Sequence, residues 1–233
     1  MAFGNRLINT DSGGATGGVI GANLNALDFG FPNTWRYGID WDGTYMYNKD
    51  RVNRRIGIGY WEAEASVSIE PLTQPVSGTH PAIAAVDDGT FLTFEYGGMS
   101  RYDASWTRIA GYGVSGWDIT ALPNGFATTS YYSNAINIYD YNGTLLNSFS
   151  ADAGAGSGYE NGLCWDGGGL WVSTGTEATT NGVIYKYTLD GTLTGDIITP
   201  WANRKWEFCG FRNDQFYALH DYGTPGRYDA ILP

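Results

Sequence analysis

Short runs of alternating hydrophobic and polar residues, separated by turns rich in Gly and Asp, cover most of the chain. The clearest stretch is Glu160–Gly195, where an apolar run at 162–165 turns at Asp166-Gly167 and returns at 170–173 before an alternating run at 183–187. Asp-Gly between such runs predicts a hairpin, because these residues accept the positive φ that a tight turn requires. We therefore expect a small antiparallel meander, which cannot bury both of its faces alone.

This pattern repeats along the chain. Turn signals comparable to Asp166-Gly167 recur every 36 to 47 residues, at Asp42-Gly43, Asp88-Gly89, Asn124-Gly125 and, in degenerate form, Asn213-Asp214. The tetrapeptide Arg-Tyr-Asp-Ala also occurs twice, at 101–104 and 227–230. Units of about 42 residues with four short strands are typical of β-propeller blades. Because helical periodicity is nearly absent, we expect an all-β chain that forms a single five-bladed β-propeller with four-stranded antiparallel blades.

The expected strands follow from the alternation within each unit. They are 38–41, 44–47, 56–61 and 65–69; 82–86, 91–95, 101–103 and 107–109; 118–122, 126–130, 136–139 and 145–149; 162–165, 170–173 and 183–187; and 208–211, 216–220 and 227–231.

Residues 1–30 differ from the rest, since they include a Gly-rich stretch and only weak alternation. We expect them to form an N-terminal arm, with residues 31–233 forming the propeller domain. The last unit ends at Pro233, directly after its third strand. A ring-closing strand from the arm, paired with 227–232, would remove the exposed edge, and the arm could also anchor the protein to a partner.

The charge of the chain disfavours two classes of partner. With 24 acidic and 13 basic residues the formal net charge is −11, which opposes binding to nucleic acid or to an anionic membrane surface. No apolar run reaches membrane-spanning length, and the first residues lack the apolar core of a signal peptide. We therefore expect no nucleic acid partner, no membrane partner and no export by the general secretory route.

The chain offers few metal-binding side chains. Its only cysteines are Cys164 and Cys209, and its only histidines are His80 and His220. Buried free thiols are favoured for the two cysteines, although a disulfide bridge between them stays open. No metal site and no cofactor are expected.

Counting back from the first turn of each unit brings aromatic and charged residues to equivalent positions. In a propeller these positions lie around one ring, so we take them as candidate ligand-binding residues of a central funnel. The aromatic residues are Trp35, Trp117, Tyr159 and Trp206, and the charged residues are Arg36, Asp118, Glu160 and Glu207. Packing between blades would also explain the aromatic residues. We expect the carboxylates to be structural, held by Arg36, backbone donors and water, and we assign no catalytic residue.

The unit around Asp166-Gly167 resembles blades of NHL and SMP-type propellers. The resemblance is carried by 162–167, by Leu170-Trp171-Val172 and by the closing hairpin 184–193. It implies a propeller, in a family that includes lactonases, binding platforms and scaffolds. A second resemblance rests on Met1–Thr10, the following Gly-rich sequence and a body with few lysines, which are similar to structural proteins of tailed bacteriophages.

These observations favour a non-enzymatic bacteriophage virion protein, serving as decoration, neck, fibre or receptor-binding module. Its partners would be other virion proteins, contacted through the arm, and a host-surface glycan. It would be a homo-oligomer or present in many copies, located in virions assembled in the host cytoplasm. Aromatic residues expected on exposed loops could contact sugars, namely Tyr60-Trp61, Trp106 and Tyr131-Tyr132. The alternatives are a soluble lectin-like propeller, or a glycoside hydrolase or lactonase that uses Asp118, Glu160 and Glu207.

Overall fold

The computed structural model describes fourteen segments of the 233-residue chain. They are 19–21, 23–27, 37–42, 44–50, 55–60, 65–71, 82–95, 98–130, 133–151, 162–174, 183–199, 205–212, 215–221 and 228–232. Every regular element within them is a β-strand, and they include no helix that could cross a membrane.

The described strands pair into five sheets. The first contains β3 (Tyr37–Trp41), β4 (Tyr45–Asp50), β5 (Arg55–Tyr60) and β6 (Ala65–Pro71). The second contains β7 (Ile83–Ala85), β8 (Phe91–Glu95), β9 (Gly98–Tyr102) and β10 (Arg108–Tyr112). The third contains β11 (Ile119–Leu122), β12 (Gly125–Thr129), β13 (Ala135–Asp140) and β14 (Leu145–Ser150). The fourth contains β15 (Leu163–Trp165), β16 (Leu170–Thr174), β17 (Val183–Tyr187), β18 (Leu193–Thr199) and β1 (Val19–Gly21). The last contains β19 (Lys205–Arg212), β20 (Gln215–Asp221), β21 (Tyr228–Leu232) and β2 (Asn23–Leu27).

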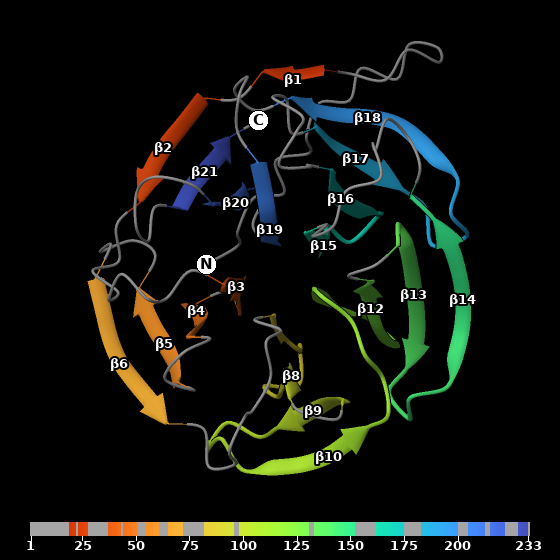
Figure 1. Ribbon diagram of the computed structural model, residues 1–233. Coiled ribbons are helices and arrows are strands. Elements are labelled where there is room, and N and C mark those ends of the chain that lie inside the picture. Colours follow the sequence, from red (N-terminus) through yellow and green to blue (C-terminus); the bar gives the residue numbers. More distant parts are fainter. Residues whose placement is uncertain are drawn as a thin grey trace, which may run out of the picture.

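The sheets stand around a common centre, with the first strand of each sheet innermost (Figure 1). The inner strands β3, β7, β11, β15 and β19 contact one another in chain order, and β19 also contacts β3. In each sheet four strands form an antiparallel meander that runs outward from the centre, and β1 adds to the fourth sheet as a parallel edge strand. The expectation of an all-β chain with four-stranded antiparallel sheets is therefore confirmed.

The N-terminal segment pairs with two different sheets. Strand β2 is antiparallel to β21, with Asn23 opposite Leu232 and Leu27 opposite Tyr228, which is the pairing that the incomplete last unit predicts. Strand β1 was not expected; it lies parallel to β18, with Val19 opposite Ile197. The division into an arm at 1–30 and a propeller domain at 31–233 stays a prediction.

The core lies between neighbouring sheets. Tyr47 and Ile56 of the first sheet pack with Phe91 and Tyr102 of the second, and similar clusters join the second sheet to the third and the third to the fourth. Both faces of a sheet in the ring meet a neighbour, so β12 is buried along its whole length, whereas burial alternates in β13 farther from the centre. Trp106, expected on an exposed loop, instead belongs to the first of these clusters and is only 5% exposed.

Two further expectations can be compared with the structure. The Cys164 side chain is buried, as predicted, whereas the side chain of Cys209 lies outside the described residues. Gly125 is the first residue of β12 and does not belong to the turn, because Leu122 pairs directly with Gly125.

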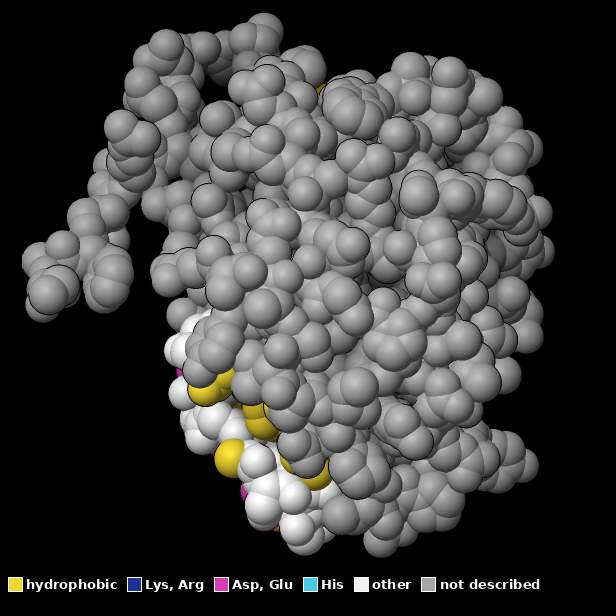
Figure 2. Space-filling model, turned by 90° about the vertical axis from the view of Figure 1, so that its left-hand side faces the viewer, with side chains coloured by type: hydrophobic (Ala, Val, Ile, Leu, Met, Phe, Trp, Pro, Cys, Tyr) yellow, Lys and Arg dark blue, Asp and Glu magenta, His cyan; other side chains and the backbone are white. Residues whose placement is uncertain are grey.

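Hydrophobic side chains are not confined to the interfaces between sheets. In the side view of Figure 2, hydrophobic groups of the described part lie at the surface beside backbone and neutral polar groups. On the outer strands, Ile109, Leu145, Leu146 and Leu193 are all substantially exposed.

Candidate functional site

Side chains of the inner strands accept hydrogen bonds from the backbone of the next sheet. Asp40 Oδ2 accepts from Ala85 N at 2.7 Å, and Asp118 Oδ2 accepts from Leu163 N at 2.7 Å. The innermost strand of a propeller sheet has one unpaired edge, whose N–H groups need partners. The carboxylates satisfy these donors, so the centre of the ring is lined by acceptors held in fixed positions.

A cavity of about 590 Å³ opens where the first turns of the second, third and fourth sheets meet. Its volume lies in the range of small-molecule sites. Four carboxylates line it together with one guanidinium and one phenol, namely Asp40, Asp87, Asp88, Asp166, Arg101 and Tyr141. This mixture of fixed charges and polar groups makes the cavity the candidate functional site.

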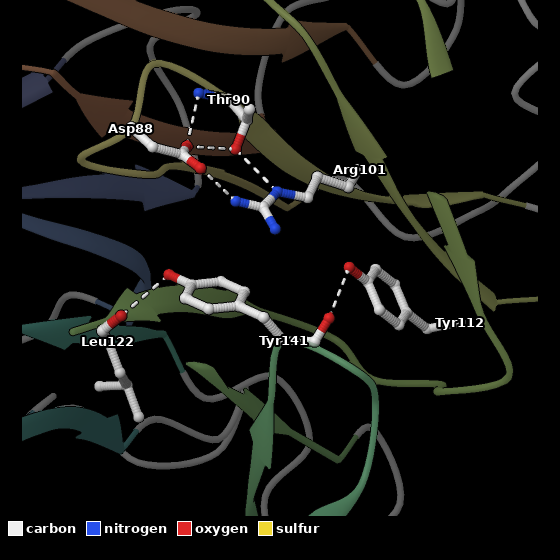
Figure 3. A network of polar contacts seen from close by, with 6 residues as sticks. All are labelled: Asp88, Thr90, Arg101, Tyr112, Leu122 and Tyr141. Carbon is white, nitrogen blue, oxygen red and sulfur yellow. Dashed lines mark hydrogen bonds and ion pairs between the residues drawn. The ribbon is translucent and has the colours of Figure 1, made fainter. Parts of the chain in front are cut away.

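Arg101 reaches this cavity from β9 and is held on two sides (Figure 3). Its Nη2 lies 2.5 Å from Asp88 Oδ2, and its Nε donates to Thr90 Oγ1 at 2.8 Å. The guanidinium carbon lies 4.6 Å from the ring centre of Tyr141, within cation–π range. Within the described part of the chain, Nη1 makes no hydrogen bond, so one donor edge of a positioned cation remains for a ligand.

Tyr141 is fixed from both ends. Its hydroxyl donates to Leu122 O at 2.9 Å, and its own carbonyl accepts from the Tyr112 hydroxyl at 3.1 Å (Figure 3). Burial raises the pKa of Tyr141 to about 12, although the nearby Arg101 charge opposes the rise. The phenol therefore stays protonated at neutral pH and acts as a rigid wall for the guanidinium.

Two of the cavity carboxylates are held in the ionised form. Burial alone would raise the pKa of Asp88, but hydrogen bonds from Thr90 and the Arg101 charge lower it below its usual value. Burial also opposes ionisation of Asp166, where the hydrogen bond from Lys186 and further donors again produce a lowered pKa. Neither side chain carries a proton to donate at neutral pH.

The pKa of Asp118 is shifted in the opposite direction. It is 3% exposed, and burial raises its pKa well above the usual value even though the backbone N–H groups of Leu163 and Ile119 favour the charged form. The Asp40 charge adds to the rise. Asp118 is not among the described residues that line the cavity.

Only some residues of the candidate ring inferred from the sequence lie within the described segments. Trp117 and Asp118 are both buried directly before β11. Trp206 and Glu207 lie in β19, of which the structure describes only the backbone. The other four residues, Trp35, Arg36, Tyr159 and Glu160, fall outside the described segments. The ring therefore stays a prediction.

Sequence reasoning missed Asp40 and Arg101 as site residues. The sequence pattern marks Asp88 only as a turn residue and Arg101 only as part of a repeated tetrapeptide. An arginine within a repeat rich in acidic and aromatic residues was the available signal. Among the residues described, no three His, Cys, Asp or Glu side chains are placed to hold a metal ion.

Comparisons with known proteins match the architecture and not the sequence. No family model matches the chain, and no curated protein matches it by sequence. Glutaminyl cyclase from Myxococcus xanthus matches with a TM-score of 0.69 at 9% identity, covering 91% of this chain and 95% of that protein. The gluconolactonase XC5397 from Xanthomonas campestris matches with a TM-score of 0.54 at 17% identity, covering 91% and 90%. Virginiamycin B lyase from Staphylococcus aureus matches with a TM-score of 0.52 at 16% identity, covering 89% and 73%.

The fold is that of a β-propeller. At these identities the likeness establishes the fold and does not transfer an activity. It nevertheless corrects the functional hypothesis. The prediction of a non-enzymatic bacteriophage virion protein is wrong, because the similar structures carry the names of enzymes and nothing in them shows similarity to a phage protein. The partners and the location that accompanied that hypothesis stay predictions.

Proposed function

We propose that this chain is an enzyme that hydrolyses a cyclic ester in the cavity at the first turns of the sheets. The observation that carries the proposal is the pairing, in one cavity of about 590 Å³, of the oriented carboxylate Asp40 with the immobilised guanidinium of Arg101. The enzyme names of the similar structures support a catalytic role, and one of them is a gluconolactonase.

Each residue has a defined part in the reaction. Asp40 acts as general base and removes a proton from water, while the oxygen of that water forms a bond to the lactone carbonyl carbon. Arg101 Nη1 donates to the oxygen on which negative charge develops. The carbon–oxygen bond of the ring then breaks, and the leaving alkoxide takes the proton from Asp40. The product is an open-chain hydroxy acid, and the carboxylate of Asp40 is restored.

The same residues favour a lactonase over a glycoside hydrolase. A glycoside hydrolase needs a carboxyl group that stays protonated beside the scissile bond. In the cavity, Asp88 and Asp166 have lowered pKa values, and Asp118, the carboxyl group whose pKa burial raises, does not line it. An ester is cleaved by a base and an oxyanion donor, both of which are available.

We also propose that the architecture is a closed propeller of five blades with NHL or SMP-type blade motifs, an arm at 1–30 and a propeller domain at 31–233. The five sheets and the contact of β19 with β3 support closure. The pairing of β2 with β21 supports the arm as the ring-closing element.

The proposed activity is tested by following acid release from δ-gluconolactone and from simpler γ- and δ-lactones. Asp40→Asn should lower the rate by about 10²–10⁴-fold, as expected for loss of a general base. Arg101→Lys should lower kcat by about 10²-fold, because lysine lacks the fixed second donor edge. Arg108→Lys is the matched control, since Arg108 on the neighbouring strand β10 bonds to Ser100 and does not line the cavity. Absence of lactone hydrolysis by the wild type, or equal rates in all variants, would refute the proposal.

A further inference from the structure

The cavity that holds Asp40 and Arg101 is larger than the ring of a simple lactone. At about 590 Å³ it has the volume of pockets that enclose drug-sized molecules. Asp40, Asp88 and Arg101 line it from the first and second sheets. Other walls belong to the third and fourth sheets, and the chemistry of those walls indicates what the substrate carries besides its ring.

Among the described residues that line the cavity, the exposed apolar side chains belong to the third and fourth sheets. Ala121 of β11 and Trp165 of β15 are partly exposed, and Pro123, in the turn after β11, is exposed. The strands β11 and β15 contact each other, and Trp165 packs against the core cluster between these two sheets. The backbone N–H of Trp165 donates to Thr120 Oγ1 at 3.1 Å, which fixes the end of β15 that carries the indole. We refer to Ala121, Pro123 and Trp165 as the apolar wall.

The polar groups of the third and fourth sheets in this cavity are already bound by the protein. The carboxylate of Asp166 accepts from two backbone N–H groups, from Trp171 Nε1 and from Lys186 Nζ, and four hydrogen bonds are the capacity of a carboxylate. The Tyr141 hydroxyl donates to Leu122 O (Figure 3). A sugar hydroxyl placed here would lose its hydrogen bonds to water and would find these partners occupied, which is unfavourable. An apolar group placed here has no such hydrogen bonds to lose.

We propose that the substrate is a lactone whose ring carries an apolar side chain, and that the apolar wall binds this side chain. The inference rests on the proposed lactone hydrolysis, because the ring must lie between Asp40 and Arg101. The side chain then extends from the ring toward Trp165, which lines the same cavity. Burial of one methylene group raises affinity about fourfold, so a pentyl chain that buries roughly three of its methylene groups should gain about 50-fold.

Hydrolysis of three δ-lactones tests this preference. δ-Decalactone is δ-valerolactone with a pentyl chain on the carbon next to the ring oxygen, and δ-gluconolactone carries hydroxyl groups instead. After correction for spontaneous hydrolysis, kcat/KM for δ-decalactone should exceed that for each of the others by about tenfold or more. A preference for δ-gluconolactone, or equal values for the three lactones, would overturn the assignment and leave the proposed reaction intact.

Calorimetry with the corresponding lactams separates binding from chemistry, because a lactam resists hydrolysis at neutral pH. The pentyl-substituted lactam, 6-pentylpiperidin-2-one, should bind about tenfold or more tightly than δ-valerolactam. Such binding without hydrolysis of any lactone would refute the proposed reaction but support binding of an alkyl chain at the apolar wall. Equal binding of the two lactams, or binding of neither, would overturn the assignment.

Variants of the apolar wall complete the test. Trp165→Gln should weaken binding of the pentyl lactam about tenfold and leave δ-valerolactam nearly unchanged, whereas Trp165→Phe keeps an apolar ring and should retain most of the affinity. Pro123→Ser changes an exposed turn residue, so it is expected to fold and should weaken binding about threefold. Leu146→Gln is the matched control, since Leu146 is 61% exposed on β14 and does not line the cavity. Equal effects of Trp165→Gln and Leu146→Gln would overturn the assignment.

Discussion

Replacement of Asp166 by Ala should destabilise the chain more than replacement of any exposed turn aspartate. Asp166 Oδ1 accepts from the backbone N–H groups of Gly168 and Gly169 at 2.8 and 2.7 Å. Its Oδ2 accepts from Trp171 Nε1 and from Lys186 Nζ, each at 2.7 Å. The Asp166 side chain is 4% exposed and that of Lys186 is 19% exposed, so solvent replaces little of what the substitution removes.

The magnitude follows from the donors that are left without an acceptor. Breaking a buried ion pair by removing one partner typically costs about 3–5 kcal/mol, because the other charge stays desolvated. For a domain of this size each kcal/mol lowers Tm by about 2–4 °C, so Asp166→Ala should lower Tm by about 10 °C. Adding Lys186→Met removes the stranded ammonium and should restore roughly half of the loss.

The stabilisation by Asp166 also depends on pH. The folded-state pKa of Asp166 lies below its usual value of 3.8, so folding favours the ionised form. The contribution is present above about pH 4 and is lost as the pH falls toward the lower folded pKa. The difference in unfolding free energy between the wild type and Asp166→Asn should therefore be constant near neutrality and shrink below pH 4.

Urea denaturation followed by tryptophan fluorescence, repeated between pH 3 and 7, measures both effects. Asp190→Ala is the matched control, since Asp190 accepts from Thr192 N at 3.1 Å in an exposed turn, and its loss should lower the unfolding free energy much less than the loss of Asp166. The reasoning is refuted if Asp166→Ala and Asp190→Ala are equally stable, or if the double variant is no better than Asp166→Ala.

Two other perturbations test the architecture. A Cβ at Gly125 would lie 1.9 Å from the carbonyl oxygen of Tyr139, so Gly125→Ala should push β12 away from β13 and lower the unfolding free energy by about 3 kcal/mol in urea denaturation. Gly89→Ala, where a Cβ meets open space at a φ of 80°, should lower it by only about 1 kcal/mol. Equal losses in the two variants would contradict the close approach at Gly125. Deletion of residues 1–27 removes the partner strand of β21 and should lower Tm by several degrees, and an unchanged Tm would show that the ring does not need that strand.

The strands could be predicted because their signals are local. The runs 91–95 and 183–187 coincide with β8 and β17, since alternation of side chains and a following turn are both written in adjacent residues. Strand β1 was missed because its three residues pair in parallel with a segment almost 180 positions away, and no short pattern encodes such a partner.

The site could not be predicted for a different reason. Asp40, Arg101 and Tyr141 belong to three different sheets, and they meet only because the ring brings those sheets together. The lengths of the first turns also differ. The last paired residue lies one position before the turn aspartate in β3 and β15, two before Asn124 in β11 and three before Asp88 in β7. Counting back from the turn therefore shifts the alignment by one residue in β11 and by two in β7, and a shift of one residue moves a side chain to the opposite face of its strand.

Part of the acidic charge of the chain stabilises turns, and this links the fold to the proposed reaction. Aspartates accept backbone N–H groups in the first and third turns of the sheets, at Asp42, Asp88, Asp166, Asp103, Asp140 and Asp190. In an antiparallel meander these two turns lie at the same end, so the carboxylates collect on the face where the candidate site opens. A neutral lactone can approach such a face without penalty, whereas the anionic hydroxy acid formed from it is repelled. The turns that shape the sheets would thus also favour release of the product.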